Sequence, residues 1–221
     1  MARILVLCLL LPIAVLVAQG QTPGTVQASG SATINVNPDQ AQLTVGVVTQ
    51  GATAQEAGSQ NASQTTAMLS ALTSVLGNNG KVQTIGYSVS PQYNNKQPAQ
   101  ITGYMASNTV QVTLYDLSRI GRLIDAANGA GANHVSSLNF GLQNPEPTME
   151  QALSQAAAQA RARAAAIASG LGSKTGAVVS AQQGGSVIPV IGLAGAASPT
   201  PIETGTVAVS ATVTVTLALT Q

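Results

Sequence analysis

The sequence predicts an α+β protein in which mainly antiparallel sheets carry helices on one face. In several stretches apolar residues alternate with polar ones, most regularly in the C-terminal "TVAVSATVTVTLALT", and a period of two is that of a half-buried strand. Other stretches repeat apolar residues every three or four positions, as an amphipathic helix does. The order is two strands, helix, two strands, helix, strand, helix and two strands, which is not the regular alternation of a doubly wound parallel fold.

The first twenty residues have the pattern of a cleavable export signal. Arg3 precedes an apolar run from Ile4 to Val17, and the small residues Ala18 and Gly20 follow it. The run is short for a segment that must cross about 30 Å of hydrocarbon. We therefore expect a signal peptide over residues 1–20 that is cleaved after Gly20, with cleavage at Ala18 and retention as an anchor as the alternatives.

Two strands and a helix are expected next. The stretch "TVQASGSATINVN" alternates strictly, the Asn-Pro-Asp sequence at 37–39 favours a turn, and a second alternating run spans Ala41–Val47. Together they predict a hairpin. Thr53 and Glu56 have the spacing of a capping box, and an apolar repeat from Met68 to Leu76 carries the helix to "GNNG". Strands over Val82–Ser90 and from about Ile101 to Leu114 follow.

Charged groups gather between residues 103 and 135, so this stretch is the first place to look for an active site. Asp116 follows a strand and precedes a helix, where its carboxylate fits an N-cap. Arg119, Arg122 and Asp125 fall on the side of that helix opposite its apolar stripe. His134 opens the next strand with no second histidine or cysteine nearby, so we interpret it as structural or exposed rather than as a ligand.

An alanine-rich helix and two further strands complete the chain. Thr148 and Gln151 suggest a second capping box, a short strand is expected over 177–182, and a Gly, Pro and Ala-rich segment precedes the final strand. We expect two small lobes, one formed by residues 21–97 with 184–221 and the other by residues 98–183.

Composition argues against catalysis and against nucleic-acid binding. Charged residues make up 7% of the chain, the net charge is +1, and aromatic residues are 2%, so neither a basic patch nor a stacking surface is present. Cys8 is the only cysteine and lies in the expected signal. One histidine and scattered carboxylates do not supply the three or four ligands of a metal site or a convergent acid–base pair. We therefore expect no enzymatic activity, no cofactor and no metal.

The apolar residues in the glycine-rich segment require a cover, because water disfavours their exposure. We predict that they contact a partner or a second copy: Val187, Ile188, Val190, Ile191 and Leu193. A homo-oligomer accounts for this pattern together with the low charge. The alternative is a binding module that contacts lipid or peptide through the loop 186–197, and deleting Ser186–Ala197 would separate the two.

Five segments, among them "ATINVNPDQAQLTVGVVTQGATAQEA", "GYMASNTVQVTLYDLSRIGRLIDAANGAGAN" and "GTVAVSATVTVTL", resemble in order the SIMPL-domain family, also called domain of unknown function 541. The resemblance spans roughly Thr25 to Leu219. It implies a periplasmic location, an association with oxidative-stress tolerance, and ring-like homo-oligomers in some members. It implies no catalytic residues that can be assigned to positions of this chain.

Overall fold

The computed structural model describes residues 24–94, 97–190 and 204–221. The expected signal peptide, Ile191 and Leu193 lie outside these ranges. The α+β class is confirmed. The elements are β1 (Thr25–Val36), β2 (Gln40–Gly51), α1 (Ala54–Leu76), β3 (Gly80–Asn94), β4 (Gln97–Leu114), the 3-10 helix η1 (Leu117–Arg119), α2 (Ile120–Gly129), β5 (His134–Gly141), α3 (Glu146–Gly170), β6 (Lys174–Val190) and β7 (Thr206–Thr220).

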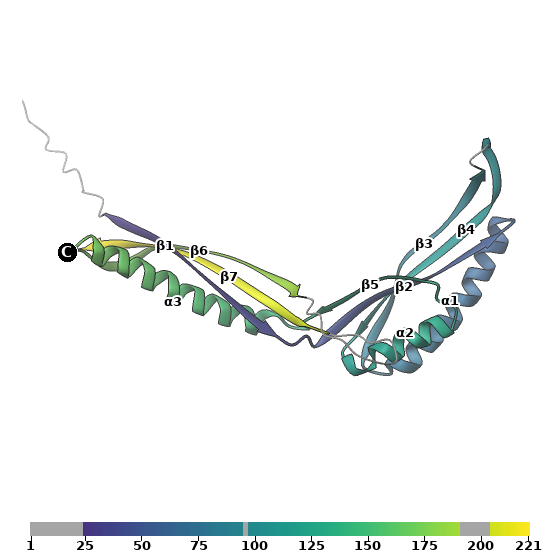
Figure 1. Cartoon of the computed structure of the whole chain (residues 1–221), viewed down its shortest axis with the longest axis horizontal. Coiled ribbons are helices and arrows are strands. Elements are labelled where there is room, and N and C mark those ends of the chain that lie inside the picture. Colours follow the sequence, from purple (N-terminus) through teal and green to yellow (C-terminus); the bar gives the residue numbers. More distant parts are fainter. Residues whose placement is uncertain (1–23, 95–96, 191–203) are drawn as a thin grey trace, which may run out of the picture.

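The strands form two antiparallel sheets, one of three strands in the order β1-β7-β6 and one of four in the order β3-β4-β2-β5. Helix α3 packs on the first sheet, and α1 packs on the second. Figure 1 shows the two sheets end to end in an elongated molecule.

The expected hairpin of the first two strands is wrong. β1 pairs along its whole length with β7, from Thr25 opposite Ala218 to Val36 opposite Val207, while β2 pairs with β4 and β5. The turn at 37–39 therefore carries the chain from one sheet to the other. A period of two tells which face of a strand is buried, but it does not tell which edge the strand joins.

The sheets also group the elements differently from the expected lobes of 21–97 with 184–221 and of 98–183. β2, α1 and β3 share a sheet and core with β4, α2 and β5, whereas α3 and β6 lie with β1 and β7. Only pairings between strands distant in sequence decide this grouping, and the local pattern carries no information on them.

Small residues bring α3 close to its sheet. The helix buries one alanine per turn, and these are Ala152, Ala156, Ala160, Ala164 and Ala168. The first four pack in one cluster with apolar residues of β1 and β7. The expected capping box at Thr148 is wrong, because the helix begins two residues earlier, at Glu146, whose amide donates to Asn144 Oδ1 at 3.2 Å.

Helix α1 covers the second sheet with an apolar half and a polar half. Met68, Leu72 and Leu76 are buried with the core of β2 and β4. Nearer its N-terminus, Asn61 is fully buried, and its Nδ2 donates to the carbonyl oxygens of Val47 and Ala106 at 2.8 and 3.2 Å. The predicted N-cap is confirmed, since Thr53 Oγ1 accepts from the Glu56 amide at 3.1 Å.

Two connecting segments are hydrogen-bonded to each other where the sheets meet. Asp39 Oδ1 accepts from the Gln143 amide at 2.6 Å, and the Asp39 amide donates to the Gly141 carbonyl oxygen at 3.0 Å. Gln40 Nε2 also donates to the Leu142 carbonyl oxygen at 2.9 Å. These bonds fix both crossings between the sheets at one point.

Candidate interaction surfaces

The charged stretch around Asp116 forms a cap and a tether. Asp116 Oδ1 accepts from the Ser118 amide and hydroxyl at 3.2 and 2.6 Å, which confirms the predicted N-cap. Arg119 Nε lies 2.7 Å from Asp116 Oδ2, and Arg119 Nη1 donates to the Val75 carbonyl oxygen at 3.3 Å. Arg119 is therefore not simply a solvated charge, because it ties η1 to the end of α1.

The same contacts set the acidity of Asp116. The Ser118 hydroxyl bond, followed by the bond from Arg119, holds the pKa of this carboxyl below its ordinary value of 3.8. Hydrogen bonds that favour the charged form lower a carboxyl pKa. The group is thus kept ionised for a structural purpose.

The other candidate reactive groups lie apart from one another. His134 is exposed at the start of β5, opposite Gly46 of β2. Glu56 accepts from the Ala52 amide at 3.0 Å as part of the α1 cap. Among the residues that the structure describes, no three His, Cys, Asp or Glu side chains gather as a metal site requires.

The predicted contact residues fall at the end of β6 and beyond it. Val187, Ile188 and Val190 pair through their backbones with Val209, Ala208 and Thr206 of β7. This segment is thus a strand where we expected a loop. Ile191 and Leu193 lie outside the described residues, so the contact itself stays a prediction.

A first candidate surface is a row of exposed apolar side chains on the β3–β4 ribbon, which we call the ribbon row. Its members are Ile85, Tyr87, Val89, Tyr93 and Ile101, at 50, 58, 38, 53 and 46% exposure. Tyr93 lies opposite Ile101. β4 pairs with β2 only as far as Tyr104 opposite Gly51, so the ribbon continues beyond the four-stranded part (Figure 1).

A second candidate surface is a groove between α3 and β6, which we call the β6 groove. It has two adjoining parts of about 430 and 380 Å³ that share Leu153 and Gln183. Ser154, Ala157, Ala181, Gln182 and Val213 line one part, and Glu146, Met149, Gly184 and Gly185 line the other. The groove exists because α3 packs mainly on β1 and β7 and leaves the β6 side open.

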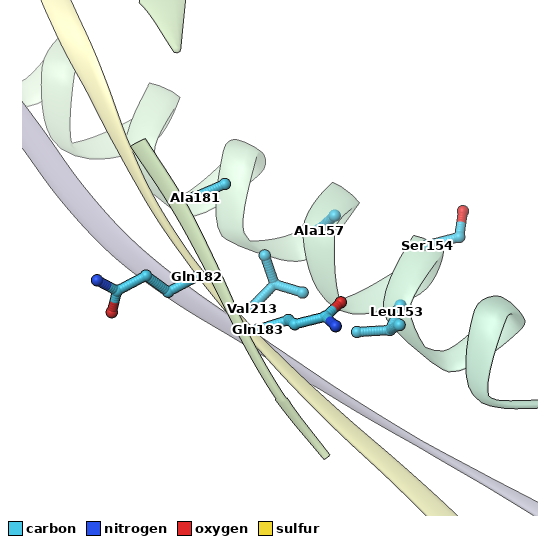
Figure 2. A pocket seen from close by; sticks show the side chains of 7 residues that line it. All are labelled: Leu153, Ser154, Ala157, Ala181, Gln182, Gln183 and Val213. Atoms are coloured by element: carbon cyan, nitrogen blue, oxygen red, sulfur yellow. The ribbon is translucent and has the colours of Figure 1, made fainter. Parts of the chain in front are cut away.

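Figure 2 shows how the first part is built. Leu153 and Ala157 come from α3, and Gln183 extends from β6 toward Leu153. Gln182 also lines this part, but its side chain extends in the opposite direction from that of Gln183. Neighbouring side chains of β6 thus point to opposite sides of the strand, as the pleat requires.

Sequence reasoning did not identify either surface. The aligned Ile85, Tyr87 and Val89 gave a signal for a strand, but their exposure follows from the position of β3 at the edge of the sheet. The β6 groove depends on where α3 lies across its sheet, for which the local pattern gives no signal.

Known proteins align with part of the chain. The 26 kDa periplasmic immunogenic protein of Brucella melitensis is 29% identical over 136 residues, which are 59% of this chain and 54% of that protein. The uncharacterized protein YggE of Edwardsiella ictaluri is 31% identical over 133 residues, 58% of this chain and 54% of its own length. YggE of Escherichia coli K12 is 28% identical over 128 residues, 56% and 51% of the two chains. The chain thus spans about half the length of these relatives.

The described helices and the family match complete the comparison. None of the helices in the described ranges combines the length and hydropathy needed to cross a membrane. The SIMPL family, described as a protein of unknown function (DUF541), matches residues 26–217. Because this match covers most of the sequence and both sheets, the chain belongs to the SIMPL family.

Proposed function

We propose that this protein is a non-enzymatic, exported envelope protein that assembles with copies of itself through the ribbon row and contributes indirectly to tolerance of oxidative or envelope stress. The observation that carries the proposal is the row itself. It comprises five large apolar side chains on one ribbon, each more than a third exposed. Several large exposed apolar side chains on one ribbon favour an interaction site more than a single exposed residue does.

The charge pattern favours a second copy as the partner. From Val82 to Asn94 and from Gln100 to Leu114 the ribbon carries no Asp, Glu, Lys or Arg. Two identical surfaces without charge meet no like-charge repulsion. Edge strands are usually protected by charged side chains, and β3 lacks this protection along the row.

Export and the stress role rest on different support. The Brucella relative is named a periplasmic protein, and residues 1–20 have the pattern of a signal peptide cleaved after Gly20. The stress role rests on the family resemblance. It is indirect in this proposal because no thiol follows Cys8, and the oxidisable side chains after residue 20 are three methionines and four tyrosines. Catalytic loss of hydrogen peroxide in a metal-free buffer containing the pure protein would contradict this part.

The assembly is tested by measuring the mass of the purified protein by sedimentation and native mass spectrometry at micromolar concentration. The wild type is expected to be an oligomer, and the double variant Tyr93→Ser, Ile101→Thr is expected to be smaller, because both side chains are about half exposed and their loss spares the core.

The matched control is Val178→Ser, Val179→Thr, which removes similarly exposed apolar surface from β6 and should leave the mass unchanged. Circular dichroism confirms that each variant is folded. A monomeric wild type, or a ribbon variant with the wild-type mass, would refute assembly through the row. The separate prediction for Val187 to Leu193 is tested by the deletion of Ser186–Ala197.

A further inference from the structure

We propose that the β6 groove binds an extended peptide, which adds to β6 as an antiparallel strand, places small apolar side chains against α3 and brings a basic amino-terminal end to Glu146. The β6 groove is distinct from the ribbon row, and peptide binding to it does not depend on self-assembly of the protein.

The edge of β6 offers the backbone groups that strand addition needs. β6 is an edge strand of the sheet β1-β7-β6, so one side of its backbone has no neighbouring strand in the described sheet. Its pairing with β7 is irregular between Thr175 and Ser180, but it is regular from Ser180 to Val190. No charged side chain occurs in this regular part. An uncharged edge is the kind of template on which an extended segment pairs, and the groove lies along Ala181–Gly185, before Pro189.

The groove beside that edge receives alternate side chains. Ala181, Gln183 and Gly185 stand opposite Val215, Val213 and Ala211, which are buried toward α3, so they belong to the helix-facing side of β6. The four residue steps from Ala181 to Gly185 span about 13 Å, enough for roughly five residues of an added strand.

The lining limits the side chains that fit. Leu153, Ala157 and Val213 give the groove an apolar wall and floor. Ala157 and Gly185 are small, so the space between helix and strand accepts a side chain of about the size of valine. Larger aromatic side chains would meet Met149, whose sulfur already lies 3.1 Å from the place of a Cβ on Gly185.

Charge sets the direction of the peptide. Glu146 lines the end of the groove near Gly184 and Gly185, and no other charged residue lines either part of it. A strand antiparallel to β6 begins at this end. Its amino terminus or a first lysine therefore meets the carboxylate of Glu146, whereas a parallel strand would bring its carboxylate there and be repelled.

The experiment uses the purified full-length protein without its expected signal peptide. The probe is the peptide Lys-Thr-Val-Thr-Val-Ser, labelled with fluorescein at its C-terminus. Binding is measured by fluorescence anisotropy. Ala157→Phe fills the groove and is expected to weaken binding at least about tenfold. The matched control is Ala158→Phe, which adds the same ring to an exposed position of α3 and is expected to bind as the wild type does.

Two further measurements test the geometry. Glu146→Gln is expected to weaken binding of the lysine peptide but not of a peptide with an acetylated amino terminus and glutamine in place of lysine. Two peptides methylated on the backbone nitrogens of odd or of even residues are compared, and one of them is expected to lose binding because its N–H groups face β6.

The proposal is overturned if the wild type does not bind the lysine peptide, if Ala157→Phe binds it as well as Ala158→Phe does, or if both methylated peptides bind like the parent. If Ala157→Phe instead changes the mass of the assembly while the wild type binds no peptide, the groove is an interface between copies. Assembly through the ribbon row is tested by the mass of the Tyr93→Ser, Ile101→Thr variant, whose substitutions lie in the other sheet. Failure of the peptide proposal therefore leaves the assembly proposal standing, and the reverse also holds.

Discussion

Gly30 of β1 lies directly beneath Ala156 of α3. A Cβ on Gly30 would overlap the carbonyl oxygen of Ala156 and would lie 3.1 Å from the Cα of Ala160. Backbone thus meets backbone at this helix–sheet contact. This approach explains why α3 buries one alanine per turn, because a larger residue on either surface would separate helix and sheet.

Gly30→Ala is expected to destabilise the protein by about 1–3 kcal/mol, because the added methyl group forces α3 away from β1. Urea unfolding followed by circular dichroism measures the change. Gly184→Ala is the control in the same sheet, since nothing lies within 4 Å of its Cβ position. Equal stability of the two variants would show that the helix adjusts at no cost.

Asn61→Ala is expected to cost about 1–3 kcal/mol, because the buried amide bridges β2 and β4 through the carbonyl oxygens of Val47 and Ala106. Thr65 would also lose the acceptor of its hydroxyl, at 3.3 Å. The free energy of unfolding is again the measurement. Gln60→Ala, at the preceding exposed position of α1, should change it little, and a similar loss in both variants would count against the bridge.

Stability is expected to depend on pH through Asp116. Its pKa in the folded protein is lowered below 3.8, so its carboxylate stabilises the fold above that value, and this contribution is lost as the pH falls through the folded pKa. The stability difference between the wild type and Asp116→Asn should therefore be larger at about pH 6 than at about pH 2.5.

Ser118→Ala serves as the control for this pH dependence. It removes the hydroxyl that donates to Asp116 at 2.6 Å, which is the largest cause of the lowered pKa. The difference in unfolding free energy between Ser118→Ala and the double variant Ser118→Ala, Asp116→Asn should therefore vary less with pH. A difference between the wild type and Asp116→Asn that is the same at both pH values would contradict the assignment.

Local features were predictable from sequence where the physics is local. The cap at Thr53 and the cap at Asp116 each depend on residues within three positions. The capping box at Thr148 failed although its spacing was right, because Pro145, Pro147 and Asn144 start the helix earlier. His134 was placed correctly at the start of a strand.

The sequence alone determined the class of the fold, the order of the strands and helices, and which face of most of them is buried, because hydrophobic period depends on neighbours along the chain. It did not show that β6 extends to Val190. Tertiary structure decided that β1 joins β7 instead of β2, that α3 leaves the side of β6 open, and that the Tyr87 and Tyr93 side chains are about half exposed. These depend on which distant edges meet and how closely a helix can approach a sheet. Such contacts are chosen by the packing of the whole chain and not by any one segment of it.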